Sequence, residues 1–455
     1  MIKMVRSKFL FALLFVLTPT IFFSQSLITG FVQYMNSDEN YLQALLNYKN
    51  AEFNYQKSLN MLTPYISLTP SLNLKQQSGN NTTLELQTPL SIELQNINGL
   101  NIKSGITFDL SYDFNSSFSN TLNLSIILTN SEIFQENTEQ LSALSDYLSK
   151  TWLLTSAKNQ LFLQYLKDYF NAYYLNEKLG ILNKQLDNKT SVYNSKERQY
   201  NNGIISESDF IQSKIDLLTT RNDILNISSQ LSGIKLQKPS KEEINLLLQL
   251  AENIKNKLPT LDEAISKMSK RPDIESLQID VQLSRINLKN YSIQRFNPSI
   301  FFSATYPTSL DKIFSSSNTN ISVGFSFSIP ILDKGENKNN MDNLNKQLEI
   351  STVKLNNTIE SLKLSLKNAY TQLDIYLNNL EIALLKSEQQ RLSYERMVSN
   401  KNYYAQTDLS LAQLNYLLSV LEVENAKFQV LVAALNIYNL IGLDIYSYFG
   451  GELSK

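Results

Sequence analysis

The sequence of 455 residues contains no cysteine and no histidine. Without cysteine the chain has no disulfides or thiol nucleophiles, and without both residue types it lacks structural zinc sites and histidine acid–base catalysis. The formal net charge of −1 at pH 7 argues against nucleic-acid binding. The acidic side chains are scattered along helical patterns with no pairing of nucleophile and base. We therefore expect no enzyme, no cofactor and no metal site.

Glycine and proline are scarce too, with 12 and 10 residues in the chain. Neither occurs between Glu336 and Ile441, and because these two residue types most often end helices, this stretch predicts little but helix. Apolar residues at heptad spacing form two seams, typical of coiled coils. The seams are Leu355, Ile359, Leu362, Leu366, Ala369, Leu373, Tyr376, Leu380 and Ala383, then Leu411, Leu414, Leu418, Leu421, Asn425, Phe428, Val432 and Leu435. The break between them predicts two antiparallel helices joined at a tip near Asn402.

Long apolar runs are lacking except at the N-terminus. There, basic residues precede an apolar run from Phe9 to Phe23, and Ser24-Gln25-Ser26 offers a cleavage site, so residues 1–26 are predicted to be a signal peptide. The alternative is an uncleaved anchor, but the run falls short of the ~20 residues that span a bilayer. Nothing else is apolar enough for a transmembrane helix, so a membrane crossing would have to use strands.

The rest of the chain follows one plan twice. Each repeat reads as a helix, strands, a long helix, a tip and a second helix, and such duplication is informative about fold. We assign residues 27–235 to the first repeat, with strands near 65–75 and 121–129 and a tip at Gly203. A connector (236–262) follows, and then the second repeat (263–455), with strands near 300–306 and 321–329 and a tip at Asn402. Period-two alternation fits strands facing lipid, although a soluble sheet with one solvated face gives the same pattern.

Several short motifs occur at corresponding places in this plan. They are Arg271-Pro272-Asp273-Ile274, Asn297-Pro298-Ser299-Ile300, Ile329-Pro330-Ile331-Leu332-Asp333-Lys334-Gly335, Tyr200-Asn201-Asn202-Gly203 with Ser206 and Asp209 spaced as an N-cap and a first-turn acid, and Leu440-Ile441-Gly442. With these motifs the chain resembles the TolC-type outer membrane efflux protein family over nearly its whole mature length.

The resemblance implies a mainly α protein with membrane β structure. In this fold, long antiparallel coiled-coil helices form a periplasmic tunnel, and a homotrimer closes one shared β-barrel in the outer membrane lipid of a Gram-negative-type (diderm) cell. The implied function is a passive exit duct for tripartite efflux of small molecules or for type I protein secretion. Its implied partners are an inner-membrane pump and a periplasmic adaptor (membrane fusion) protein that docks at the tips.

Two features depart from the family pattern. The first repeat carries extra alternation near 84–114, which we interpret as an added hairpin beside the barrel strands. Asn402 stands where the family has glycine at the second tip. Asparagine is the next best residue for a left-handed turn, so we expect it to keep that geometry.

Two other protein classes could use the same coiled coil. A periplasmic adaptor would need glycine-rich halves around one helical hairpin, which so few glycines do not provide. A trimeric surface adhesin would repeat a short motif and anchor once at its C-terminus, whereas strand patterns occur here twice in mid-chain.

The candidate site residues lie at the two tips. Gly203, Asp209, Asn402, Tyr403 and Tyr404 are candidates for adaptor docking, with tight turns as the alternative explanation. Asp408 occupies the position of the family's gate aspartate, where a trimer would form a ring of carboxylates. The alternative is a first-turn acid stabilised by the helix dipole. The family's second gate acid is replaced here by Leu411.

Overall fold

The computed structural model describes residues 20–59, 65–77, 81–97, 100–113, 117–130, 138–294, 299–308, 320–326 and 333–453. The chain divides into a helical unit (Met1–Ala44, Leu153–Lys270 and Ser361–Lys455) and a sheet unit (Leu45–Trp152 and Arg271–Glu360). Residues 1–19 of the predicted signal peptide lie outside the described residues, as do residues 297–298 and 329–332 of the corner motifs.

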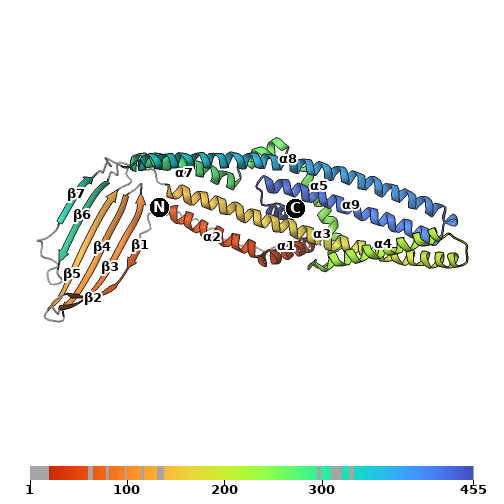
Figure 1. Ribbon diagram of the computed structural model, residues 1–455, viewed down its shortest axis with the longest axis horizontal. Coiled ribbons are helices and arrows are strands. Elements are labelled where there is room, and N and C mark those ends of the chain that lie inside the picture. Colours follow the sequence, from red (N-terminus) through yellow and green to blue (C-terminus); the bar gives the residue numbers. More distant parts are fainter. Residues whose placement is uncertain are drawn as a thin grey trace. The chain divides into compact units, whose positions relative to one another are not determined.

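The sheet unit contains one seven-stranded antiparallel sheet, drawn in Figure 1. Its strands are β1 (Tyr65–Leu68), β2 (Ser71–Gln77), β3 (Asn81–Ile97), β4 (Leu100–Asp113), β5 (Ser117–Asn130), β6 (Ser299–Thr308) and β7 (Asn320–Ser326). The strand order is β1-β3-β4-β5-β6-β7, and β2 also pairs with β3. The extra strands of the first repeat therefore lie inside the sheet, because β3 pairs with β1 and β2 on one side and β4 pairs with β5 on the other. The side chains of β3 and β4, in which the alternation near 84–114 falls, lie outside the described residues.

Helix α7 (Pro272–Gln294) begins in the sheet unit where the Arg271-Pro272-Asp273 motif predicts a helix start. Proline suits the first helical position, since its missing N–H would have no partner there. Arg271 is only 5% exposed: its guanidinium donates to both carboxylate oxygens of Asp273, at 2.9 and 2.7 Å, and lies 3.9 Å from the Trp152 ring centroid. The motif thus fixes the start of α7 with a buried, charge-assisted contact.

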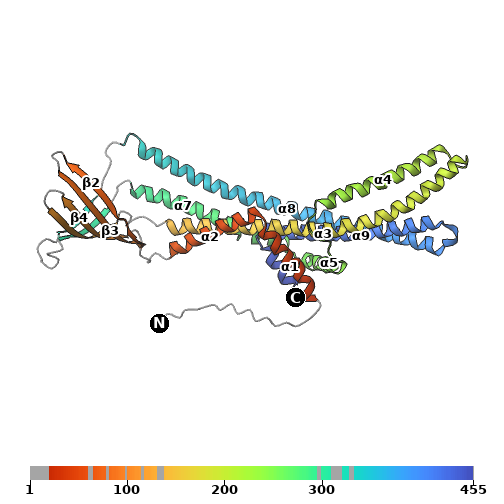
Figure 2. The ribbon, with the colours of Figure 1, turned by 90° about the horizontal axis from the view of Figure 1, so that it is seen from below.

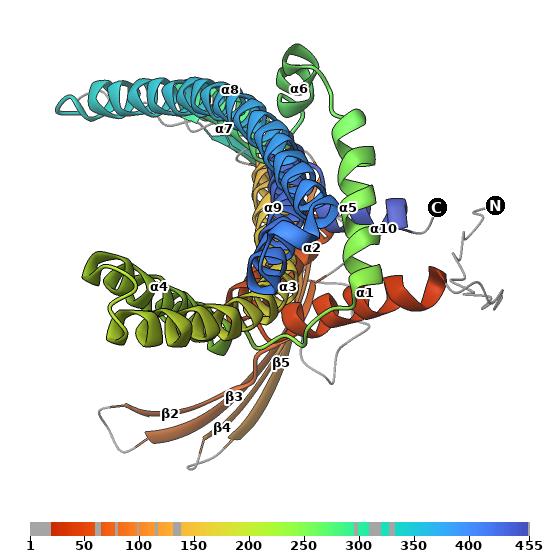
Figure 3. The same cartoon turned by 90° about the vertical axis from the view of Figure 1, so that its right-hand side faces the viewer.

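The helices elsewhere in the chain are α1 (Thr20–Asn36), α2 (Glu39–Leu59), α3 (Glu139–Asn201), α4 (Glu207–Ser232), α5 (Lys241–Asn256), α6 (Leu261–Met268), α8 (Glu336–Ser399), α9 (Gln406–Leu440) and α10 (Ile445–Leu453). In the helical unit α4, α3, α9 and α8 follow one another in an arc, with α5, α6 and α10 on its convex side (Figure 3). None of the described helices has the length and hydrophobicity needed to cross a membrane.

Both predicted coiled-coil seams point inward. Every member of the two seams is buried or half-buried, and Leu366 and Leu435 have no exposed surface. The Phe428 ring of the second seam stacks on Phe170 of α3 at 4.1 Å between centroids. The seams are therefore confirmed as the faces by which α8 and α9 pack.

Helix α8 starts directly after the Asp333-Lys334-Gly335 corner. Lys334 and Gly335 have φ angles of 52° and 84°, a left-handed pair that turns the chain into the helix. The Asp333 carboxylate accepts from the backbone N–H of Gly335 at 3.0 Å and of Asn337 at 3.1 Å. These bonds, that of Gly335 first, lower the pKa of Asp333.

The end of α9 is held by a buried asparagine of α3. Asn159 has no exposed surface, and its amide nitrogen donates to Asn439 Oδ1 at 2.9 Å and to the Leu443 carbonyl at 2.8 Å. Its Oδ1 accepts from the N–H of Ile445 at 2.9 Å. One side chain therefore satisfies the turn between α9 and α10, where helix-end backbone groups lack helical partners.

Candidate functional site: the helical tips

The two tips lie at the same end of the helical unit, as Figures 1 and 2 show. The first tip closes through Gly203, whose φ is 69°. Its N–H bonds to the Tyr200 carbonyl at 2.9 Å, and the N–H of Ile204 bonds to the Gln199 carbonyl at 2.8 Å. This is the Schellman arrangement, in which a left-handed residue after the helix satisfies the last carbonyls.

The start of α4 confirms the predicted cap. Ser206 Oγ accepts from the N–H of Asp209 at 3.1 Å, and the same hydroxyl donates to Asp209 Oδ2 at 2.7 Å. Phe210 stacks on Tyr200 across the turn at 5.1 Å between centroids. The Asp209 carboxylate is therefore already engaged in a local structural contact.

The second tip turns differently from expectation. Residues Lys401–Tyr403 form a 3-10 helix, with Tyr403 N–H bonded to the Asn400 carbonyl at 2.9 Å. Asn402 does not have a positive φ, so the expected left-handed asparagine is wrong. The physical reason is that the i to i+3 bonds reverse the chain with ordinary right-handed residues. Tyr403 is left 87% exposed at the apex, and Tyr404 is also exposed.

Asp408 lies in the first turn of α9, as both interpretations of it require. Its carboxylate is exposed and, unlike that of Asp209, makes no hydrogen bond or ion pair within the described part of the chain. The N-cap of α9 is Ala405, which offers no capping side chain. Asp408 is therefore free to meet ions or a partner, and it also lies where the helix dipole favours an anion.

A polar ladder between α3 and α9 was not foreseen from the sequence. Gln185 donates to Asn415 at 3.0 Å, Asn188 to Ser410 at 2.7 Å, and Tyr174 to Glu422 at 2.6 Å. Lys178 adds an ion pair to Glu422 at 3.3 Å. For Asn415 and Glu422 the available signal was the seven-residue spacing of Asp408, Asn415, Glu422 and Gln429, which puts all four on one face of α9. Ser410 lies off that face, and the sequence gives no signal for it.

Among the described residues no group of three or more acidic side chains could hold a metal ion. Each tip presents instead exposed apolar or aromatic side chains: Tyr200 and Ile204 at the first tip, and Val398, Tyr403 and Tyr404 at the second. Exposed side chains of this kind suit contact with another protein better than chemistry on a small molecule.

Comparisons with known proteins agree with this architecture. The sequence model of the family described as outer membrane efflux protein matches residues 42–234 and 267–443. No curated protein sequence matches the chain. The gap between the two matched segments contains α5, the linker after it and most of α6.

Solved structures of similar fold cover almost the whole chain. CusC, from a study of folding and transmembrane channel formation, aligns with a TM-score of 0.59 at 14% identity, over 92% of each chain. The CmeC outer membrane channel of Campylobacter jejuni gives 0.56 at 13% identity, over 95% of this chain and 90% of the other. The outer membrane protein VceC of Vibrio cholerae gives 0.57 at 11% identity, over 91% and 96%. At these identities the likeness shows the fold alone.

Proposed function

Because the chain belongs to the outer membrane efflux protein family, we propose that it is the outer membrane exit duct of a tripartite efflux system, a passive channel and not an enzyme. The observation that supports this proposal most directly is the repeated plan of the chain. Two sets of strands contribute to one sheet, and two pairs of long helices end in two tips at one end of the helical unit. The domain boundaries given above, with a connector at 236–262 between two repeats, belong to the same proposal.

The proposed duct is a homotrimer, and exposed apolar stripes at the edges of the arc support it. On α8 the stripe comprises Leu364, Ile375, Ile382, Leu385 and Leu392. On α4 and the turn before it, the stripe comprises Ile204, Ile211, Ile215, Leu218 and Leu225. Both follow heptad spacing, the pattern of a helix that needs a coiled-coil neighbour. Since α4 and α8 are the two ends of the arc, the stripe of one copy would pack on that of the next (Figure 3).

The sheet supports a shared barrel in the outer membrane. Leu68 and Leu72 of the first strands and Val323 of β7 are all exposed in the single chain, at 60%, 65% and 71%. A membrane-spanning sheet has to close so that no backbone edge meets lipid. Three copies of the sheet would supply that closure, with apolar side chains toward lipid.

The tips are the proposed docking surface for a periplasmic adaptor. Gly203, Asp209, Asn402, Tyr403 and Tyr404 all lie in or beside the two turns, and Tyr403 offers a large exposed aromatic surface of the kind enriched at interfaces. Asp408 is the proposed gate residue, one carboxylate from each copy. The Asp408 carboxylate has no partner within the described residues, which supports that role because its charge remains available to ions.

The duct is tested with purified full-length protein. We expect a heat-dissociable trimer by native mass spectrometry and ion-conducting pores in planar bilayers. Leu385→Glu, on the exposed stripe of α8, should abolish the trimer, because it would bury three unpaired carboxylates. Leu384→Glu is the matched control, since Leu384 is also exposed but lies off the stripe. A monomer without pores, or equal loss of trimer in both variants, would contradict the proposal.

A further inference from the structure

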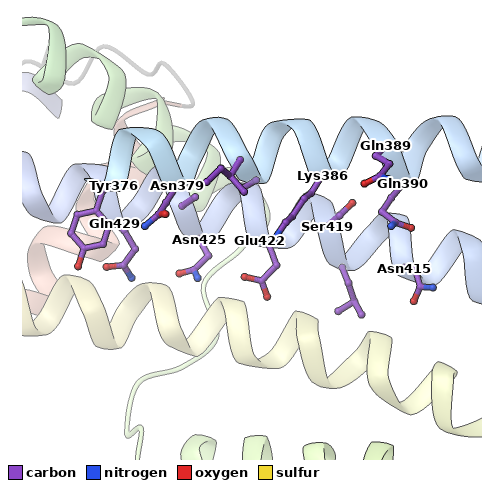
Figure 4. Close-up of a pocket in the computed structure, with 14 residues that line it drawn as sticks. Tyr376, Asn379, Lys386, Gln389, Gln390, Asn415, Ser419, Glu422, Asn425 and Gln429 are labelled. Atoms are coloured by element: carbon purple, nitrogen blue, oxygen red, sulfur yellow. The ribbon is translucent and has the colours of Figure 1, made fainter. Parts of the chain in front are cut away.

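A groove runs between α8 and α9 within the helical unit, apart from the tips; it borders the exposed stripe of α8, with which it shares Ile382. Its volume is about 750 Å³, within the ~300–1,000 Å³ usual for small-molecule sites. Figure 4 shows side chains of both helices lining it. Along α8 it extends from Tyr376 to Gln390, roughly 20 Å at ~1.5 Å per residue. The groove is therefore long and narrow.

The groove opens away from the connector. The Tyr370 hydroxyl donates to the Pro259 carbonyl at 2.6 Å, which marks the face of α8 toward the segment between α5 and α6. At ~100° per residue, Asn379 and Lys386 lie roughly opposite Tyr370 around the helix. Because α5 and α6 are on the convex side of the arc, the groove faces the concave side (Figure 3).

On helix α8, the uncharged polar residues and the charged residues lie mainly on opposite faces. Between Ser361 and Ser393, the face with the groove carries uncharged amides and hydroxyls with a single lysine: Ser361, Ser365, Asn368, Gln372, Asn379, Lys386, Gln390 and Ser393. The opposite face carries the charges: Lys363, Lys367, Asp374, Glu381, Glu388 and Glu395. From α9 the groove also receives the carboxylate of Glu422, which is paired with Lys178. With one charge of each sign, from Lys386 and Glu422, among uncharged polar groups, the groove is suited to contact with a molecule of no net charge.

The walls of the groove offer free hydrogen-bonding groups above an apolar floor. The side chains of Asn379, Gln389, Gln390, Asn425 and Gln429 make no hydrogen bond within the described part of the chain. Ala383, Leu418 and Ala426 also line the groove. Each amide provides both a donor and an acceptor.

We propose that this groove binds a neutral, hydroxyl-rich molecule of the oligosaccharide class. A sugar ring has an apolar C–H face for the floor and a rim of hydroxyls, each a donor and an acceptor, for the amides. A lipophilic drug would leave the amides unpaired, which disfavours it. The groove lies within one chain and does not require the assembly, whereas its exposure to transported molecules rests on the proposed duct.

The test uses the full-length protein in detergent and maltohexaose as the probe. Isothermal titration calorimetry should show saturable binding. Replacing two wall amides, in the variant Asn379→Leu with Gln390→Leu, should weaken the affinity about tenfold or more. Asn378→Leu is the matched control, because Asn378 is an exposed neighbour that does not line the groove, and it should bind as the wild type does. Circular dichroism checks that all variants remain helical.

Absence of saturable binding to the wild type would overturn the proposal. So would equal affinities of the wild type and the double variant, or tighter binding of a linear unfolded peptide or of a polygalacturonate anion. Bilayer recordings separate this result from the duct. A protein that forms pores without binding the sugar would refute only the groove proposal, and a protein that binds the sugar without forming pores would refute only the duct.

Discussion

Substituting Asp408 by asparagine tests the proposed gate with the smallest change in shape. Asparagine keeps the size of the side chain, replaces one acceptor oxygen by a donor NH2 group, and removes one charge per copy, three per trimer. In the single chain this carboxylate has no side-chain partner among the described residues, so folding should lose only its favourable interaction with the helix dipole, ~0.3–1 kcal/mol. The trimer should therefore remain intact.

The effect on ions should be larger. For a ring in which each of three carboxylates lay about 7 Å from a cation on the axis, the cation would gain roughly 0.6 kcal/mol from each in water. A Debye length of ~8 Å at physiological salt reduces the sum to about 0.8 kcal/mol for a monovalent ion and about twice that for a divalent one. Removing the ring should thus lower the preference for monovalent cations about fourfold and the affinity for a blocking divalent cation about tenfold.

The assay is a planar-bilayer recording with divalent cations added on the tip side. Asp408→Asn should relieve the block and shift the reversal potential away from cation selectivity. Asp209→Asn is the control, since that carboxylate is held by Ser206 and should affect the cap of α4 more than the conductance. If the two variants change block and selectivity alike, the ring is refuted and Asp408 is a first-turn acid only.

Three further outcomes follow from other parts of the fold. Gly203→Ala should destabilise the protein by ~1–2 kcal/mol in denaturant titrations because of its left-handed φ, whereas Asn402→Ala should be nearly neutral; equal losses would contradict the turn geometry. Asn159→Leu should cost about 2–5 kcal/mol by leaving buried backbone groups of the α9–α10 turn unpaired, and a smaller loss would show that water replaces the amide. Burial alone would raise the pKa of Asp444, but the hydrogen bonds from Lys158 and Ser447 outweigh burial. The pKa of Asp444 in the folded protein is therefore lowered. This contact therefore stabilises the fold above the pKa of Asp444 in the unfolded chain, and the stabilisation is lost as the pH falls through its pKa in the folded protein. In thermal melts, the melting temperature of Asp444→Asn should fall less steeply with decreasing pH than that of the wild type.

Much of the helical architecture could be predicted from the sequence because its signals are local. The seams of α8 and α9 follow a seven-residue period, and the start of α4 follows the spacing of Ser206 and Asp209. Each of these depends on neighbours within a few residues, so one chain without relatives suffices to find them. The cap in particular is confirmed atom by atom.

The remainder depends on contacts distant in sequence or on small differences between turns. The place of β3 and β4 in the sheet is set by pairing with strands on both sides, and alternation alone gives no partner. At Asn402, the preference of asparagine for left-handed turns does not exclude the 3-10 turn that forms there. In the sequence, the amides of the α8–α9 groove look like ordinary solvated positions of a helix. Only the packing of the seam determines that they line a groove.

The difference between the tips at Gly203 and at Lys401–Tyr403 has a consequence for the number of partners that a trimer can bind. A trimer built from this chain would display six tips of two chemically different kinds. Three would be closed by Gly203 beside the aliphatic Ile204, and three by a turn that exposes Tyr403. A partner that recognises one kind would bind as three copies per trimer. One that tolerates both would bind as six, with two inequivalent sets of contacts. Counting bound partners by native mass spectrometry would therefore show whether one kind of tip or both kinds are recognised.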